Sequence, residues 1–310
     1  MVKLFWGLLK ESRPRQWIKN FAVFAALIFS GSLFDRAAQI KSFEAFLLFC
    51  GFSSATYLLN DVFDIERDKL HPFKSKRPIA SGLISQSVAI TLALGLIVTL
   101  LPLSYKLSPA FFFAAISYLT LQLLYSSYLK QIILIDVLVI AAGFVLRVYG
   151  GVWAIDAHLN VWFLLSVTSF ALFLAIGKRR SERTLLEATA ARHRETLLHY
   201  PENLLDILTS MFANSTWLTY AFFAFLQPPI LARQSFSLIL GGFELPLTEA
   251  KYLMATVPVV IYAVMRYLYI IYEKKEGESP ERVILTDYPL LTAVVIYIFM
   301  VIGIIYYLRS

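Results

Sequence analysis

Hydrophobic runs of about 20 residues recur along the whole chain and alternate with shorter polar segments. A helix of this length crosses the roughly 30 Å hydrocarbon core of a bilayer, whereas continuous apolar runs do not fit the alternating pattern of membrane β-strands. We therefore predict an all-α, polytopic membrane protein with about nine transmembrane helices. Their approximate ranges are 17–34, 43–60, 84–104, 108–127, 133–154, 160–177, 206–227, 252–272 and 288–308.

Composition supports a membrane protein and adds a charge bias. Apolar residues make up 58% of the chain and charged residues 16%, against about 25% in soluble domains, yet the net charge is +7. Of the 28 Lys and Arg residues, 21 fall on the side that holds the N-terminus and six on the other. Because cytoplasmic loops are enriched in basic residues, we predict a multi-pass plasma-membrane protein with its N-terminus in the cytoplasm and its C-terminus outside. A basic excess beside anionic headgroups gives no reason to expect nucleic acid as a partner.

The polar segments define three cytoplasmic loops, at about 61–83, 178–205 and 273–287. The segment 228–251 is only moderately apolar and contains two consecutive prolines, so the sequence leaves open whether it is a long loop or a half-inserted helix. No internal repeat or linker-like stretch divides the chain. We therefore expect residues 1–310 to form one transmembrane domain, and the sequence is compatible with a monomer or a homo-oligomer.

An acidic motif closes the second predicted span, where residues 60–68 read NDVFDIERD. At 3.6 residues per turn, the carboxamide and three carboxylates of this motif fall on one helix face. Carboxylates this close repel one another unless a cation neutralises them, and Mg²⁺ prefers oxygen ligands that it often shares with substrate phosphates. The sequence therefore predicts a Mg²⁺ site whose three carboxylates are catalytic. Its ligands are Asn60, Asp61, Asp64 and Asp68.

The alternative for this motif is an acidic helix end on a solvated face, paired with Arg67 and Lys69. Acidic residues number only 21 in the chain, and four of them fall within eight residues directly after an apolar helix. A solvated helix end does not need a carboxamide and a carboxylate at the membrane edge, so we favour the metal site. Basic residues follow in KSKRPIASG at 74–82. Cations beside a metal are typical of diphosphate binding, and the alternative for them is the basic belt of the cytoplasmic side.

Residues 60–68, followed by RPIASG at 77–82, resemble the first motif of the UbiA superfamily of intramembrane prenyltransferases. Nine helices with an inner N-terminus also fit that family. The resemblance implies a helical bundle around a central cavity that opens to the cytoplasm, with a lateral opening for a polyprenyl chain. It further implies that Mg²⁺ bridges the carboxylates to a diphosphate.

The chain departs from the prenyltransferase pattern after the sixth predicted span, where residues 177–182 read GKRRSE in place of a second acidic motif. Together with the stretches at 13–20, 125–147 and 277–287, these residues resemble the phosphoribosyltransferase branch of the superfamily. The resemblance implies transfer of 5-phosphoribose from 5-phosphoribosyl diphosphate to a polyprenyl phosphate of the decaprenyl type, with release of diphosphate. The product of that branch feeds arabinose donors for cell-wall arabinogalactan.

This implied chemistry needs cations for the donor's 5-phosphate and for the acceptor's phosphate, in addition to the diphosphate. Arg side chains bind phosphate oxygens in pairs. The candidates are Lys178, Arg179 and Arg180, followed by Lys19, Lys74, Arg77 and Lys130. Glu182 is a candidate ligand of a ribose hydroxyl or of a second metal, and Tyr128 is a candidate for a sugar hydroxyl, with interfacial anchoring as its alternative. The acceptor phosphate is already nucleophilic, so no general base is expected.

The sequence leaves two alternative functions, a prenyltransferase and a transporter. A prenyltransferase that moves an isoprenyl group to an aromatic or other small acceptor would be expected to carry carboxylates at 178–182. A transporter would place polar groups at the midplane of the membrane, which is nearly empty of charge here. The exception is Arg147, which shares a helix face with Asp136 at a distance of about 16 Å. The sequence leaves open whether Arg147 pairs with an acid, extends outward or lines a lipid groove.

Overall fold

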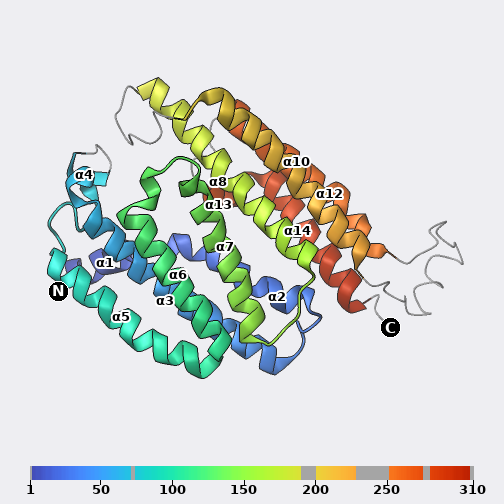
Figure 1. Cartoon of the computed structure of the whole chain (residues 1–310), viewed down its shortest axis with the longest axis horizontal. Helices are drawn as coiled ribbons and strands as arrows, with labels where there is room; N and C mark the ends of the chain where they lie inside the picture. Colours follow the sequence, from blue (N-terminus) through green and yellow to red (C-terminus); the bar gives the residue numbers. More distant parts are fainter. Residues whose placement is uncertain (1, 71–73, 190–199, 228–250, 275–279, 308–310) are drawn as a thin grey trace, which may run out of the picture. The chain divides into compact units, whose positions relative to one another are not determined.

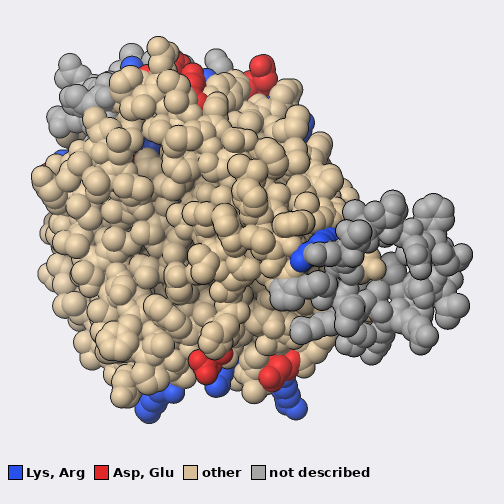
Figure 2. Space-filling model, turned by 45° about the vertical axis from the view of Figure 1, so that its right-hand side comes forward, with Lys and Arg blue, Asp and Glu red and all other residues tan. Residues whose placement is uncertain are grey.

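The computed structural model describes residues 2–70, 74–189, 200–227, 251–274 and 280–307, and these residues form helices and turns without a β-strand. Seven helical stretches among them are long and apolar enough to cross a membrane. The predicted all-α, membrane-spanning class is therefore confirmed. Most of the surface in Figure 2 carries no charge, and the acidic and basic side chains on it occur in small groups.

The seven stretches correspond to seven of the predicted spans. The predicted span at 17–34 is divided between a 3₁₀-helix and a six-residue α-helix, and the span at 206–227 lies in a 25-residue helix that is not among the seven. The number nine stays a prediction. Most of the proline-containing segment 228–251 lies outside the described residues, as do residues 190–199 of the predicted loop 178–205. The start of that predicted loop, up to Thr189, instead continues the helix Val161–Thr189.

The chain divides into two compact units. The first unit includes the described residues up to His158. Figure 1 shows its helices, coloured blue to green. They are α1 (Val2–Glu11), η1 (Pro14–Val23), α2 (Phe24–Phe29), α3 (Arg36–Phe63), α4 (Ile65–Lys69), η2 (Lys74–Lys76), α5 (Gln86–Leu107), α6 (Pro109–Ser127), η3 (Leu129–Gln131) and α7 (Ile135–Ala154).

Helix α3 is the centre of this unit and packs against α5, α6 and α7. Its buried Phe49 ring meets the rings of Phe111 and Tyr118 edge to face, with centroids 5.4 and 5.5 Å apart. Such pairs stabilise a core beyond the burial of their area. Ser85 and Ser108 cap α5 and α6 by accepting a backbone N–H bond, each worth about 1 kcal/mol.

The 3₁₀-helix η1 lies close along α7 because α7 presents glycine at the contact. A Cβ atom on Gly151 would overlap the carbonyl oxygen of Val23, at the end of η1. Pro14 at the first position of η1 fits a helix start, since its ring presets φ and its missing N–H has no intrahelical partner there. Helix η1 is thus packed closely against α7.

The second unit includes the described residues from Leu159 onward. Its elements are α8 (Val161–Thr189), α10 (Glu202–Leu226), η4 (Tyr252–Thr256), α12 (Val257–Tyr269), the π-helical turn η5 (Ile270–Lys274), α13 (Pro280–Thr286), α14 (Tyr288–Ile302) and the π-helical turn η6 (Gly303–Tyr307). Helix α10 runs along α8, and α12 packs on α10 and α14 (Figure 1). An almost wholly apolar cavity of about 230 Å³ lies among these helices, lined by side chains that include Phe163, Tyr220 and Val264.

Candidate active site

The acidic motif lies where α3 gives way to α4. Helix α3 ends at Phe63, Asp64 has a non-helical backbone (φ −95°, ψ 4°), and α4 begins at Ile65. The predicted continuous helix is therefore interrupted at Asp64. The amide of Asp68 donates to the Asp64 carbonyl at 2.8 Å, so Asp64 accepts the first hydrogen bond of α4. The side chains of Asp61 and Asp68 are buried, and that of Asp64 is partly open.

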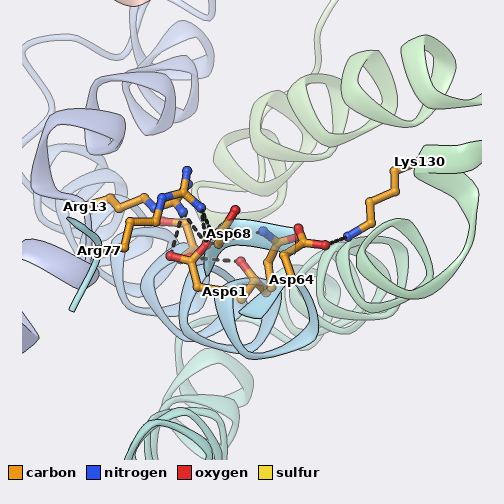
Figure 3. A network of polar contacts seen from close by, with 9 residues as sticks. Arg13, Asp61, Asp64, Asp68, Arg77 and Lys130 are labelled. Carbon is orange, nitrogen blue, oxygen red and sulfur yellow. Dashed lines mark hydrogen bonds and ion pairs between the residues drawn. The ribbon is translucent and has the colours of Figure 1, made fainter. Parts of the chain in front are cut away.

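Two arginines hold the carboxylate of Asp61, as Figure 3 shows. Arg13 Nη2 contacts both carboxylate oxygens, with 2.6 Å to Oδ2. Arg77 Nη1 lies 3.0 Å from Asp61 Oδ1 and 2.6 Å from Asp68 Oδ2, so it bridges two carboxylates. Charge-assisted hydrogen bonds of this kind are about twice as strong as neutral ones. Arg77, a predicted site residue, is thus next to the acidic motif.

Arg13 is a site residue that sequence reasoning missed. Its backbone is left-handed (φ 51°, ψ 60°), which costs an L-residue roughly 1–2 kcal/mol, and the following Pro14 restricts it further. Its guanidinium lies 4.9 Å from the centre of the Tyr57 ring. No local signal links Arg13 to Asp61, 48 residues away. The only hint was its place in the stretch 13–20.

Lys130 holds the third carboxylate. Its Nζ lies 2.6 Å from Asp64 Oδ1, and the residue is only 4% exposed (Figure 3). Tyr128, two residues earlier, is 62% exposed, as expected of an interfacial side chain. The amide of Asn60 is 3.5 Å from Asp61 Oδ1. The structure therefore brings Arg77 and Lys130 to the acidic motif and leaves Tyr128 on the surface.

A fourth carboxyl group lies beside the motif. Glu11, at the end of α1, is buried, and this burial together with the nearby charge of Asp61 raises the pKa of Glu11 to about 7. Burial also raises the pKa of Asp68, against the opposing effect of Arg77 and of Lys74 on η2. Lys74 thus influences the motif electrostatically. Lys19 lies on η1 and is partly exposed.

The donor atoms of the motif suit a hard cation, because they are all carboxylate or carboxamide oxygens. In the part of the chain that the structure describes, no three His, Cys, Asp or Glu side chains come together as ligands of one ion. Each Asp carboxylate is instead directed to a basic side chain. By donor chemistry the residues fit Mg²⁺, provided that the basic side chains share or release the carboxylates.

In the second unit, the basic stretch lies on α8. Arg179 is 1% exposed, and its Nη1 lies 2.5 Å from Glu182 Oε2, one turn further along the same helix. Lys178 Nζ is 3.8 Å from the other oxygen of Glu182, and 34% of the Lys178 side chain is exposed. Three of the predicted binding residues are therefore joined by pairing within one helix.

Arg180 points to other helices of its unit. Its Nε donates to Asp206 Oδ1 on α10 at 3.0 Å, its guanidinium stacks on the Tyr272 ring at 3.9 Å, and its Nη1 donates to the Ile271 carbonyl at 3.3 Å. Tyr272 also donates to Asp206, at 2.9 Å. Arg180 therefore joins α8, α10 and η5.

The last predicted stretch, 277–287, is described from Pro280 onward. Its Asp287 caps α14 by accepting the Leu290 amide at 3.1 Å, and it accepts from Arg266 and Lys274 at 2.8–2.9 Å. Hydrogen bonds from Arg266, and then from Lys274 and Leu290, hold the pKa of Asp287 well below its ordinary value.

Membrane-spanning helices with an acidic motif between α3 and α4 are typical of a class of intramembrane enzymes. Sequence comparison identifies the family to which this chain belongs. A model of the UbiA prenyltransferase family matches residues 20–286, so the chain belongs to this family. The family resemblance seen in the sequence is confirmed.

Similar proteins narrow the class. The decaprenyl-phosphate phosphoribosyltransferase of Mycolicibacterium smegmatis is 38% identical over 223 residues, which cover 71% of this chain and 70% of that protein. The enzyme of the same name from Corynebacterium glutamicum is 33% identical over 308 residues, 97% of this chain and 87% of that protein. Among solved structures, a UbiA homolog from Archaeoglobus fulgidus bound to GPP and Mg²⁺ matches with a TM-score of 0.68 and 18% identity, covering 96% of this chain and 99% of that one. This likeness shows a UbiA fold.

Proposed function

We propose that the protein is a membrane-embedded phosphoribosyltransferase. It transfers 5-phosphoribose from 5-phosphoribosyl diphosphate to a polyprenyl phosphate of the decaprenyl type and releases diphosphate, as a step toward cell-wall arabinose donors. The observation that carries the proposal is the similarity, at 33–38% identity, to enzymes named for decaprenyl-phosphate phosphoribosyl transfer, one of which aligns with 97% of the chain. The basic GKRRSE stretch supports a donor rich in phosphate.

In the proposed reaction, an oxygen of the lipid phosphate attacks C1 of the ribose, and the bond from C1 to the diphosphate oxygen breaks. Negative charge develops on the leaving diphosphate. When bound, Mg²⁺ would be held by Asp61, Asp64 and Asp68, with Asn60 beside them, and would offset this charge. The acceptor is already an anion near neutral pH, so orientation and charge stabilisation carry the catalysis.

Arg13, Arg77 and Lys130 have two proposed tasks. Without substrate they neutralise and orient the three carboxylates, which they contact directly. With substrate they supply N–H donors to phosphate oxygens, because a phosphate competes well with a carboxylate for Arg. Exchange of partners would free the carboxylates for the cation.

In the second unit, Lys178 is the proposed phosphate ligand that is best exposed, and Glu182 orients Arg179. Arg180 is engaged by Asp206 and Tyr272, which favours a role in fixing α8. The nearly apolar cavity of this unit supports binding of an isoprenoid chain. The sequence also predicts Lys19, Lys74, Tyr128, Arg179, Arg180 and Glu182 as substrate-binding residues, and for Arg180 we propose the structural role instead.

The family match extends through parts of both units, which supports residues 1–310 acting as one functional domain. The charge asymmetry supports a cytoplasmic N-terminus and active site and an outer C-terminus. Membership of the UbiA family supports nine spans around a cavity that opens to the cytoplasm. A homo-oligomer is compatible with this arrangement.

The alternative function is prenyl transfer, because the family is named for prenyltransferases. One assay separates the two functions. Purified protein in detergent receives radiolabelled 5-phosphoribosyl diphosphate, polyprenyl phosphate and Mg²⁺. A parallel reaction receives an isoprenyl diphosphate and an aromatic acid. We expect a labelled lipid product in the first reaction, and its loss when EDTA removes divalent cations. Turnover in the second reaction alone would overturn the proposal.

A further inference from the structure

Arg147 is a buried cation whose hydrogen-bond acceptors are all neutral. It lies in the middle of α7 and is 5% exposed. Its Nε donates to Asn20 Oδ1 at 2.7 Å, its Nη1 to the Gly143 carbonyl at 2.7 Å, and its Nη2 to the Tyr118 hydroxyl at 2.9 Å. No carboxylate contacts it among the residues that the structure describes. A guanidinium does not lose its proton in a protein, so this charge is permanent.

A permanent charge inside a membrane bundle is costly, and such residues usually serve function. A core built only for stability would be expected to use an apolar side chain here. Besides the Gly143 carbonyl of its own helix, Arg147 contacts Tyr118 on α6 and Asn20 on η1. Of these three acceptors, Asn20 is the one that lies on η1, the helix that follows Arg13.

Asn20 fixes η1 from two sides. It is fully buried, accepts from Arg147, and donates through Nδ2 to Cys50 Sγ at 3.3 Å and Ser53 Oγ at 3.2 Å, both on α3. One turn after Arg147, Gly151 allows the end of η1 to approach α7 closely. Asn20 is therefore held between α7 and α3 where Arg147 reaches it.

The other end of η1 begins at the acidic motif. Arg13 precedes its first residue and contacts Asp61. Seven residues of 3₁₀-helix place Asn20 about 14 Å along η1 from Arg13. A hydrogen-bonded helix transmits a displacement of one end to the other. The place where Asn20 is held between α7 and α3 therefore sets the position from which Arg13 reaches Asp61. The left-handed backbone of Arg13 leaves little freedom to compensate.

We propose that Arg147 is a positioning residue: by anchoring Asn20, it seats η1 so that Arg13 reaches Asp61. Arg147 itself contacts neither substrate nor the acidic motif in this scheme. The expected effect of Arg147 on kcat/KM rests on the proposed function. The position of η1 does not, and it can be measured separately through the accessibility of Cys50.

Cys50 supplies that readout, since it is the single cysteine of the chain, is 3% exposed and lies against Asn20. Folded protein in detergent is labelled with a maleimide at a temperature well below its Tm. Arg147→Gln should speed labelling of Cys50 about tenfold or more. The reason is that it removes a charged hydrogen bond that holds η1 against α7 and keeps Cys50 covered. Arg147→Lys keeps the charge but loses the several N–H donors of the guanidinium, so its labelling rate should lie between those of wild type and Arg147→Gln.

Tyr118→Phe is the matched control, because it removes a different acceptor of Arg147 and leaves Asn20 in place. Its labelling rate should stay within about threefold of wild type. If Tyr118→Phe accelerates labelling as much as Arg147→Gln, the whole bundle has loosened and the proposal fails. It also fails if Arg147→Gln labels at the wild-type rate. Should Arg147→Gln not fold, the comparison of Arg147→Lys with Tyr118→Phe decides the same question.

A double-mutant cycle tests the connection to Arg13. If Arg147 acts through Arg13, then Arg147→Gln should lower kcat/KM by about tenfold in the wild-type background and by less than about twofold when Arg13 is already Lys. If the effects of Arg147→Gln and Arg13→Lys on kcat/KM simply multiply, Arg147 does not act through Arg13 and the positioning role is overturned. If wild type makes no lipid-linked phosphoribose, the proposed function fails, while the labelling result still decides whether Arg147 seats η1.

Discussion

The acidic motif of the first unit and the basic stretch of the second are built in opposite ways. In the first, the carboxylates lie within eight residues, and their cations come from three separate segments of the chain. In the second, Lys178 and Arg179 pair with Glu182 one turn away on the same helix. The first arrangement depends on the fold, whereas the second exists as soon as α8 forms.

This difference affects what a bound phosphate can change. Partners on separate elements can exchange with little change in either element, as proposed for Arg13 and Arg77 at Asp61. Partners on one helix stay close whatever binds. Substitutions in the first unit should therefore affect the reaction rate, and those in the second should divide between substrate binding and stability.

The largest effect is expected from Asp61→Asn. This change keeps the size of the side chain but removes the charge that Arg13 and Arg77 share. We expect kcat to fall by about 10²–10³, the loss typical of removing one preorganised electrostatic partner. Initial rates with both substrates saturating measure it.

Glu66→Gln is the control for this prediction. Glu66 belongs to the same motif, but its side chain is exposed and pairs with Lys69 at 2.9 Å. Exposed pairs contribute little, so its kcat should stay within about twofold of wild type. Equal losses in the two variants would show that the charge of the whole motif matters, rather than the ion pairs of Asp61.

An intermediate effect is expected from Lys178→Ala. Its partly exposed ammonium is the phosphate ligand proposed above, so the KM for 5-phosphoribosyl diphosphate should rise about tenfold while kcat changes little. Steady-state kinetics in the donor concentration measure the change.

Arg180→Gln provides the contrast two residues away. It breaks the contacts with Asp206 and Tyr272, so it should lower the melting temperature and change the donor KM less than Lys178→Ala does. The opposite pattern would assign phosphate binding to Arg180.

The smallest effect is expected from Asp287→Asn, and it depends on pH. The pKa of Asp287 is lower in the folded protein than in the unfolded chain, mainly because of Arg266. Its stabilising contribution is therefore complete above the unfolded pKa of about 3.9 and is lost as the pH falls below that value. Asp287→Asn should lower the melting temperature at pH 7, and this difference from wild type should shrink toward pH 3.

Glu202→Gln, which changes an exposed carboxyl at the start of α10, is the control. Its difference from wild type should be small at both pH values. A constant difference for Asp287→Asn between pH 7 and pH 3 would contradict the charge-based explanation.

Hydropathy was sufficient to locate helices such as α5 and α14, because apolar runs of that length have few other stable structures in a bilayer. It failed to describe 17–34, where the polar residues Lys19 and Asn20 lie in a 3₁₀-helix fixed by tertiary contacts. Periodicity also missed the break at Asp64, since no Gly or Pro marks it.

The acidic motif was recognisable because its members are close in sequence. Its partners were not equally visible: Arg77 follows nearby, but Arg13 is separated by 48 residues and was identified only from the fold. Arg147 could not be explained from the sequence because its acceptors are neutral groups, one of them 127 residues away. Local spacing carries information about ligands on one helix and little about those brought together by packing.

The pairing of three basic with three acidic side chains at the motif has a kinetic consequence. Opposite charges in equal number cancel at distances larger than the cluster, so this set exerts little long-range steering on an approaching anion. In the proposed reaction, recognition of phosphate would then occur at contact, within a Debye length of about 8 Å, through competition for hydrogen-bond donors rather than through long-range attraction. We therefore expect the proposed site to select among anions by how well each one replaces a carboxylate.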